Sequence, residues 1–200
     1  MDPELPEDCV FSPEDSGEGR AFVYVLPYAG EDWVKLGFSS APLIRFQAFH
    51  RRWFEVFDLD RGFLVEAETV REARQIELRW RHKLSIHRAP APLVVDRRAG
   101  GDTEWLRGAM AQLGLQALEL QLIGYRLHQP FAPWIRHTMA TRLESVRAWV
   151  LYWNEQIRAL APSDPMIRVL RRMVSDTTDA YIALDVLCAQ TNEQIPKEWI

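Results

Sequence analysis

The chain has 200 residues, of which 48% are hydrophobic and eight are tryptophan, so it can bury the core of one large domain or two small ones. Its formal net charge of −4 is unevenly spread: residues 1–20 carry seven acids and one base, residues 21–109 are net +2, and residues 110–200 are neutral. Two cysteines exclude a disulfide framework, and the lack of a signal peptide or an 18-residue apolar run predicts a cytoplasmic protein with no membrane partner.

The N-terminal half predicts an acidic tail followed by a small α/β domain. Residues 1–19 are rich in Pro, Asp, Glu, Gly and Ser, so we expect them to be disordered. The next two apolar runs flank an Ala-Gly turn and predict a β-hairpin. Ser39 or Ser40 should then cap a helix that has Pro42 in its first turn. The expected elements are a strand at 21–27, a strand at 33–38, a helix from the serines to about 53, a strand at 62–66 and a helix at 69–87.

The C-terminal half predicts an edge strand at Leu93–Val95 and then only helices. Thr103 should cap a helix that begins at Glu104 and ends near residue 127. From Ile135 to Leu160 the apolar residues are spaced 4, 4, 3, 4, 3, 4 and 3, a heptad-like seam typical of packed helices. A last helix from about 166 to 188 should pair with it as an antiparallel hairpin. We therefore expect an α+β protein with a disordered tail at 1–19, an α/β domain at 20–109 and an all-α helical bundle at 110–200.

The order strand, turn, strand, helix carries a set of motifs. Phe22-Val23-Tyr24 lies on the first strand and Lys35-Leu36-Gly37-Phe38-Ser39 on the second. Arg45 follows on the next helix, and Ala73-Arg74-Gln75-Ile76-Glu77 on the later one. Glu104-Trp105 comes after these. Together the motifs resemble the GIY-YIG nuclease superfamily, in particular its phage-type branch, whose second motif often reads Lys-Ile-Gly. The resemblance covers about 90 residues.

This resemblance implies a metal-dependent endonuclease that hydrolyses phosphodiester bonds in DNA. Tyr24 would orient or deprotonate the attacking water, Lys35 would stabilise charge or lower the pKa of Tyr24, and Arg45 would clamp phosphate. Glu77 would hold Mg²⁺ or Mn²⁺, because one carboxylate suffices when water and substrate supply the other ligands. The nucleic acid would be contacted by Gly37, Ser39, His50 and Arg81.

Each of these residues also has an ordinary structural explanation. Glu77 could form ion pairs on the surface of a helix with Arg74 and Arg81. Glu104 could be an acid favoured by the first turn of a helix. Phe22 stands where the family has glycine, so a catalytically inactive GIY-YIG-like module remains the alternative, binding nucleic acid or protein through the helical C-terminal domain. Residues 110–200 could also form a homodimer or bind a protein partner.

Overall fold

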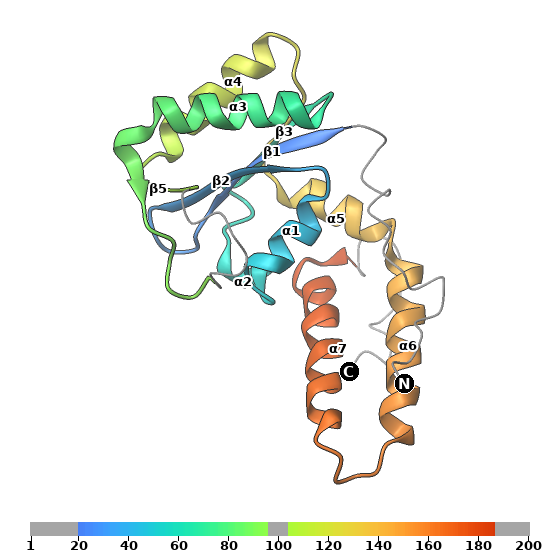
Figure 1. Ribbon diagram of the computed structural model, residues 1–200. Coiled ribbons are helices and arrows are strands. Elements are labelled where there is room, and N and C mark those ends of the chain that lie inside the picture. Colours follow the sequence, from blue (N-terminus) through green and yellow to red (C-terminus); the bar gives the residue numbers. More distant parts are fainter. Residues whose placement is uncertain (1–19, 96–103, 187–200) are drawn as a thin grey trace. The chain divides into compact units, whose positions relative to one another are not determined.

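The structure is a computed structural model that describes residues 20–95 and 104–186 (Figure 1). It is a mixed α+β protein, as expected from the sequence. The predicted disorder of residues 1–19, the cap at Thr103 and the last turn of the C-terminal helix lie outside the described residues. Among the helices that are described, none combines the length and the apolar character needed to cross a membrane.

Six strands form one sheet in the order β4-β5-β2-β1-β3-β6, and every neighbouring pair is antiparallel. The hairpin predicted at its centre is confirmed. It places Tyr24 opposite Gly37, and its turn contains Gly30 at a positive φ of 78°. The strands are β1 (Ala21–Pro27), β2 (Trp33–Ser39), β3 (Phe63–Ala67), β4 (Arg88–Ala89), β5 (Trp105–Arg107) and β6 (Leu127–His128).

The helices account for most of the remaining described chain. The helix expected from 69 to 87 is confirmed over most of its length, and Thr69 caps it by accepting a hydrogen bond from the amide of Glu72 at 3.1 Å. A 3₁₀ turn, η3 (Ser85–His87), follows it. The α-helices are α1 (Pro42–Phe49), α2 (Trp53–Val56), α3 (Val70–Lys83), α4 (Met110–Leu122), α5 (Ala132–Ala140), α6 (Leu143–Ala159) and α7 (Met166–Ala183).

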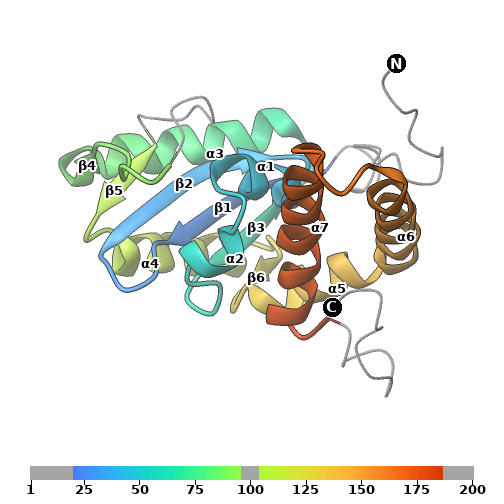
Figure 2. The same cartoon turned by 90° about the horizontal axis from the view of Figure 1, so that it is seen from below.

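The two faces of the sheet are covered by different helices. Val23 and Val25 of β1 belong to a core that also contains Ile76 of α3 and Leu113 of α4, so these two helices cover one face. Tyr24 points to the other face, where it contacts the rings of Phe46 and Phe49 on α1. Figure 2 shows α1 and α2 in front of the strands on this face. The alternation along β1 therefore separates an aliphatic core from an aromatic one.

Three local predictions are wrong. Leu93–Val95 forms a turn rather than an edge strand. Glu104 to Leu106 does not begin a helix, because Trp105 and Leu106 pair with β2 as strand β5. The helix expected to reach residue 53 breaks at His50 and resumes as α2. In each case hydrogen bonding between distant segments, or a local turn, outweighs the local pattern.

The chain divides into two compact units, and the boundary lies between Pro133 and Trp134. The boundary expected after residue 109 is therefore wrong. Helix α4 adds Leu113, Ala117 and Leu120 to the core of the sheet, and β6 pairs with β3. The segment 110–133 thus belongs to the α/β unit.

The second unit is helical over its described residues. The seam from Ile135 to Leu160 is divided between α5 and α6 by a turn at Thr141-Arg142. Helices α6 and α7 lie antiparallel to each other, as expected (Figure 1). The buried hydroxyl of Tyr181 on α7 donates a hydrogen bond to the carbonyl of Met139 on α5 at 3.2 Å. This bond connects the two helices.

Candidate functional site

Only two charged residues are buried in the part of the chain that the structure describes, and both are predicted site residues. Lys35 is 0% exposed and Glu77 is 2% exposed. Burying a charge costs several kcal/mol unless it is paired and hydrogen-bonded. Their burial therefore has a free-energy cost that a purely structural position would avoid with an apolar side chain.

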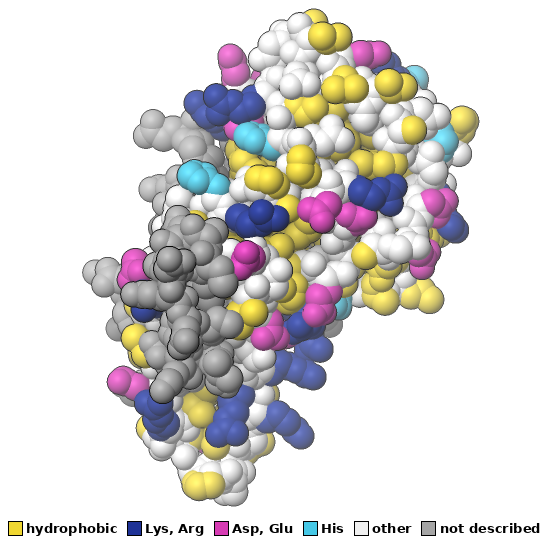
Figure 3. Space-filling model, turned by 180° about the vertical axis from the view of Figure 1, so that it is seen from behind, with side chains coloured by type: hydrophobic (Ala, Val, Ile, Leu, Met, Phe, Trp, Pro, Cys, Tyr) yellow, Lys and Arg dark blue, Asp and Glu magenta, His cyan; other side chains and the backbone are white. Residues whose placement is uncertain are grey.

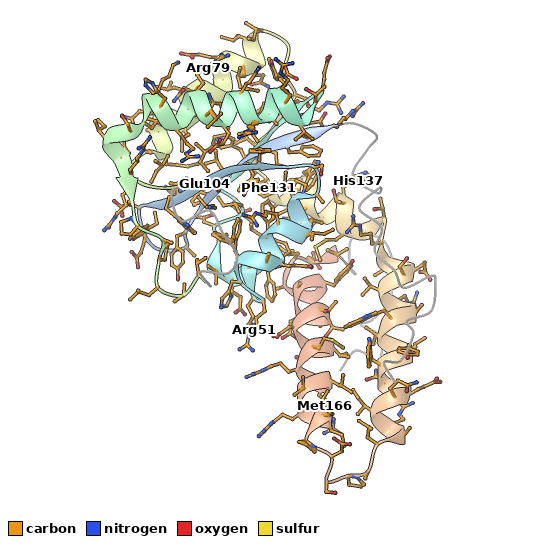
Figure 4. The ribbon with its side chains drawn as sticks, viewed as in Figure 1. Arg51, Arg79, Glu104, Phe131, His137 and Met166 are labelled. Atoms are coloured by element: carbon orange, nitrogen blue, oxygen red, sulfur yellow. The ribbon has the colours of Figure 1, made fainter. Side chains whose placement is uncertain are left out.

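Lys35 lies on β2 in a pocket of aromatic rings closed by a carboxylate. Its Nζ is 5.0 Å from the centroid of Phe49 and 5.4 Å from that of Trp105. The same Nζ donates to Oε2 of Glu104 at 2.8 Å. The backbone holds the pair in register, because the carbonyl of Glu104 accepts from the amide of Leu36 at 3.0 Å. Glu104 is labelled in Figure 4, immediately before β5.

Tyr24 and Gly37 lie opposite each other on β1 and β2. A Cβ atom on Gly37 would be 2.3 Å from the hydroxyl oxygen of Tyr24, so only glycine leaves room for the ring to lie across β2. Arg45 of α1 lies close enough to Tyr24 to oppose the rise in its pKa, and the Arg45 guanidinium lies 4.8 Å from the centroid of Phe49. The lack of a side chain at Gly37 therefore allows the Tyr24 ring to take its position.

Glu77 lies on α3, whose apolar side chains cover the opposite face of the sheet. Its Oε1 accepts a hydrogen bond from Nη1 of Arg81 at 3.1 Å. Its charge nevertheless influences the pKa of both Tyr24 and Lys35. The structure thus joins Tyr24, Lys35, Arg45, Glu77 and Glu104 in one electrostatic network.

Burial controls the protonation of the network. It raises the pKa of Tyr24, which Arg45 opposes and which Glu104 and Glu77 reinforce. Burial lowers the pKa of Lys35, which the hydrogen bond that Lys35 donates to Glu104 opposes, and raises the pKa of Glu77, which Arg81 opposes. At neutral pH the phenol of Tyr24 keeps its proton, so it can orient a reactant by hydrogen bonding but is a poor base. Arg45, rather than Lys35, is the cation that opposes the rise in the Tyr24 pKa.

Two predicted nucleic-acid contacts have local structural roles. The Oγ of Ser39 accepts from the amide of Ala41 at 3.0 Å, just before α1. Nδ1 of His50 accepts from the amide of Arg52 at 3.1 Å, at the break between α1 and α2. Neither contact brings its side chain into the network around Lys35.

Glu104 is the residue that sequence reasoning missed. It was assigned to the first turn of a helix, whereas it is the carboxylate partner of Lys35. The signal was present in the Glu104-Trp105 motif, because both residues contact the Lys35 ammonium group.

The described residues contain no cluster of three or more His, Cys, Asp or Glu side chains suited to a metal ion. A Mg²⁺ ion that keeps several waters needs only one or two carboxylates, so Glu77 alone could hold it if water and substrate supplied the other ligands. A pocket of about 470 Å³ lies elsewhere, at the end of β3. Glu66, Glu72, Tyr125 and Arg126 contribute to its lining, and it includes none of the predicted site residues.

No protein family, curated protein or solved structure matched the chain in the comparisons made with each. The functional assignment therefore depends on the residues themselves and on the geometry described above.

Proposed function

We propose that the chain is a metal-dependent endonuclease that hydrolyses phosphodiester bonds in DNA, with a GIY-YIG-like catalytic domain. The supporting observation is that Lys35 and Glu77, the two buried charges of the described chain, belong to one network with Tyr24 and Arg45. Ionisable groups with perturbed pKa values cluster at functional sites more often than elsewhere. The network also contains the residue types that phosphodiester hydrolysis requires.

Each side chain has a role that follows from its surroundings. Arg45 is only partly buried, so its guanidinium can contact a phosphate from the surface while its positive charge acts on Tyr24. Tyr24, which keeps its proton, would orient the attacking water. Lys35, held by Glu104, would place a fixed positive charge near the phosphate oxygens. Glu104 is thus a positioning residue for Lys35.

Glu77 fits the role of the metal-holding carboxylate. Burial raises its pKa, which means that its negative charge is poorly stabilised even with Arg81 beside it, and a cation would relieve this cost. A bound Mg²⁺ or Mn²⁺ would supply Lewis-acid stabilisation of the charge that develops on the phosphate. Arg81 would keep the carboxylate in its orientation through the hydrogen bond to Oε1.

One observation favours a catalytically inactive binding module as the second candidate. Tyr24 is 1% exposed and Lys35 is wholly buried, so neither meets solvent in this conformation. A fold that had lost its chemistry could keep these groups as a closed polar core. In this case the helical C-terminal unit would carry the binding.

The experiment that separates the two candidates is cleavage of supercoiled and branched DNA by the purified chain with Mg²⁺ or Mn²⁺. We expect cutting that EDTA abolishes and that Glu77→Gln lowers at least about 100-fold, a loss of about 2.7 kcal/mol of transition-state stabilisation. Glu68→Gln is the matched control, because this exposed carboxylate lies just before the same helix. Absence of cutting on every substrate, or equal cutting by Glu77→Gln, would reject the nuclease.

A further inference from the structure

Helix α4 is apolar on two faces, and only one of them is used within the α/β unit. Leu113, Ala117 and Leu120 pack in the core of the sheet. On the opposite side Leu115 is 62% exposed, Leu118 is 47% exposed and Leu122 is 87% exposed. Figure 3 views the molecule from the side on which α4 lies in front of α3, and hydrophobic side chains gather on that part of the surface.

The exposed residues form a regular seam. Ala111 is also exposed, and the sequence positions 111, 115, 118 and 122 are spaced 4, 3 and 4. This is the spacing of the a and d positions in a pair of packed helices. At a rise of 1.5 Å per residue the seam is about 16 Å long. A contiguous apolar stripe is a candidate interaction surface, whereas single exposed leucines are ordinary on a protein surface.

We infer that α4 is a homodimer interface, on which a second copy of the chain packs its own α4 antiparallel across a two-fold axis. The seam is symmetric about the midpoint between Gln116 and Ala117. An antiparallel copy therefore places Ala111 opposite the partner's Leu122, and Leu115 opposite the partner's Leu118. A small residue faces a large one at each end and two leucines face each other at the centre, which makes the surface complementary to itself.

The polar residues beside the seam also fit a second copy. Glu119 is the only charged residue in α4, and it lies on the same flank of the seam as Gln112. In the antiparallel arrangement the amide of Gln112 lies on the side of the partner's Glu119 and can donate to it. Like charges are therefore not brought directly opposite each other, and the few polar groups at the rim can pair.

Gly114 is a second observation that points to a close partner. Glycine inside a helix destabilises it by roughly 0.5–1 kcal/mol relative to alanine, so a glycine at this position needs a structural explanation. The described residues offer no such reason, because a Cβ atom on Gly114 would meet none of their atoms within 4 Å. It lies on the other flank of the seam, where an antiparallel copy would bring the partner's Gln121, and the missing side chain leaves room for that amide.

The first test is the oligomeric state of the full chain, measured by sedimentation equilibrium over a wide concentration range. We expect a reversible dimer, and we expect Leu118→Glu to raise its dissociation constant at least about 100-fold, because it places two charges in the centre of the seam. Leu78→Glu on α3 is the control, since Leu78 is equally exposed at 47% but lies off the seam. Circular dichroism checks that both variants are folded.

The second test reads the orientation of the helices. Gln112→Lys should tighten the dimer by pairing with the partner's Glu119, whereas Gln112→Glu should weaken it, with a difference of about tenfold between the two dissociation constants. Both substitutions are at an exposed position and leave the fold intact. A monomer at all concentrations, a dimer unaffected by Leu118→Glu, or equal effects of the two changes at position 112 would overturn the antiparallel α4 dimer. The first two results would also follow if the helical unit of the same chain covered the seam.

Discussion

At the scale of single residues, Lys35 and Glu104 show how the protein maintains a charge in its interior. The ammonium group has aromatic rings on two sides and a carboxylate on a third. This arrangement satisfies the charge without solvent, and the 24% exposed side chain of Glu104 connects it to the surface. The two residues therefore differ in what their loss would do to the fold.

Removing Glu104 should destabilise the protein more than removing Lys35. Glu104→Ala leaves a buried ammonium group without its counter-ion and should cost about 2–3 kcal/mol of unfolding free energy, below the range for a fully buried pair because Glu104 is partly solvated. Lys35→Met removes the buried charge at similar volume and should change stability by less than about 1 kcal/mol while abolishing cleavage. Urea unfolding at pH 7 measures both. Equal losses of stability would show that Lys35 is needed for packing rather than for chemistry.

The stability of the fold should also depend on the titration of Lys35. Because burial lowers its pKa in the folded state, the unfolded chain holds more protons than the folded chain between that lowered pKa and the ordinary value of 10.5. The free energy of unfolding of the wild type should therefore rise relative to Lys35→Met as pH increases towards 10.5. Urea unfolding of both proteins in EDTA across pH 7–10.5 tests this, and Tyr24 titrates in both, so its contribution largely cancels. A constant difference would contradict it.

At the scale of elements, the hairpin and α3 show how a residue pattern combined with a specific turn or cap predicts an element. The hairpin has alternating residues around Gly30, and α3 has Thr69 before an apolar stripe. The Glu104-Trp105-Leu106 segment looked like the start of a helix but became β5, because its partner on β2 lies about 70 residues earlier in the chain. No local pattern contains this information. The seam from Ile135 onward keeps its period through the turn at Thr141, so no local pattern marks the break.

The cap of α3 offers a test at this scale. Thr69→Ala removes the acceptor for the amide of Glu72 and should lower the unfolding free energy by about 1 kcal/mol, whereas Thr69→Ser should retain it. Thermal or urea unfolding measures the change. Cleavage at 25 °C should be unaffected, because Glu77 lies two turns beyond the cap and packs independently of it. A loss of activity with unchanged stability would contradict this separation.

At the scale of the whole molecule, the sequence singled out residues that interact electrostatically, but it did not predict the extent of the α/β unit. The order of the motifs identified Tyr24, Lys35, Arg45 and Glu77, and these share one network. The extent of the α/β unit could not be predicted, because the apolar residues of α4 suit a helical bundle as well as a sheet. The structure shows that the apolar residues of α4 contact the sheet, and that β6, which follows α4, pairs with β3.

The boundary leads to a prediction about truncation. A chain that ends at residue 109 lacks Leu113, Ala117 and Leu120 and should fail to fold, because the sheet loses part of its core. A chain that ends at residue 140 keeps the α/β unit and α5 and should give dispersed amide signals in an NMR spectrum. A folded product from the shorter chain would show that the α/β domain does not need α4 in order to fold.

The separation of Lys35 and Glu104 by 69 positions also determines when the network can assemble. During synthesis the hairpin emerges first, with an ammonium group on β2 that has no carboxylate to receive it. Helix α3 and the whole connection after it must be made before Glu104 arrives, and closing so long a loop carries an entropic cost that local contacts do not. The polar interior of this protein can therefore form only after the hairpin segment has been made, and a nascent chain released before residue 104 would lack the network.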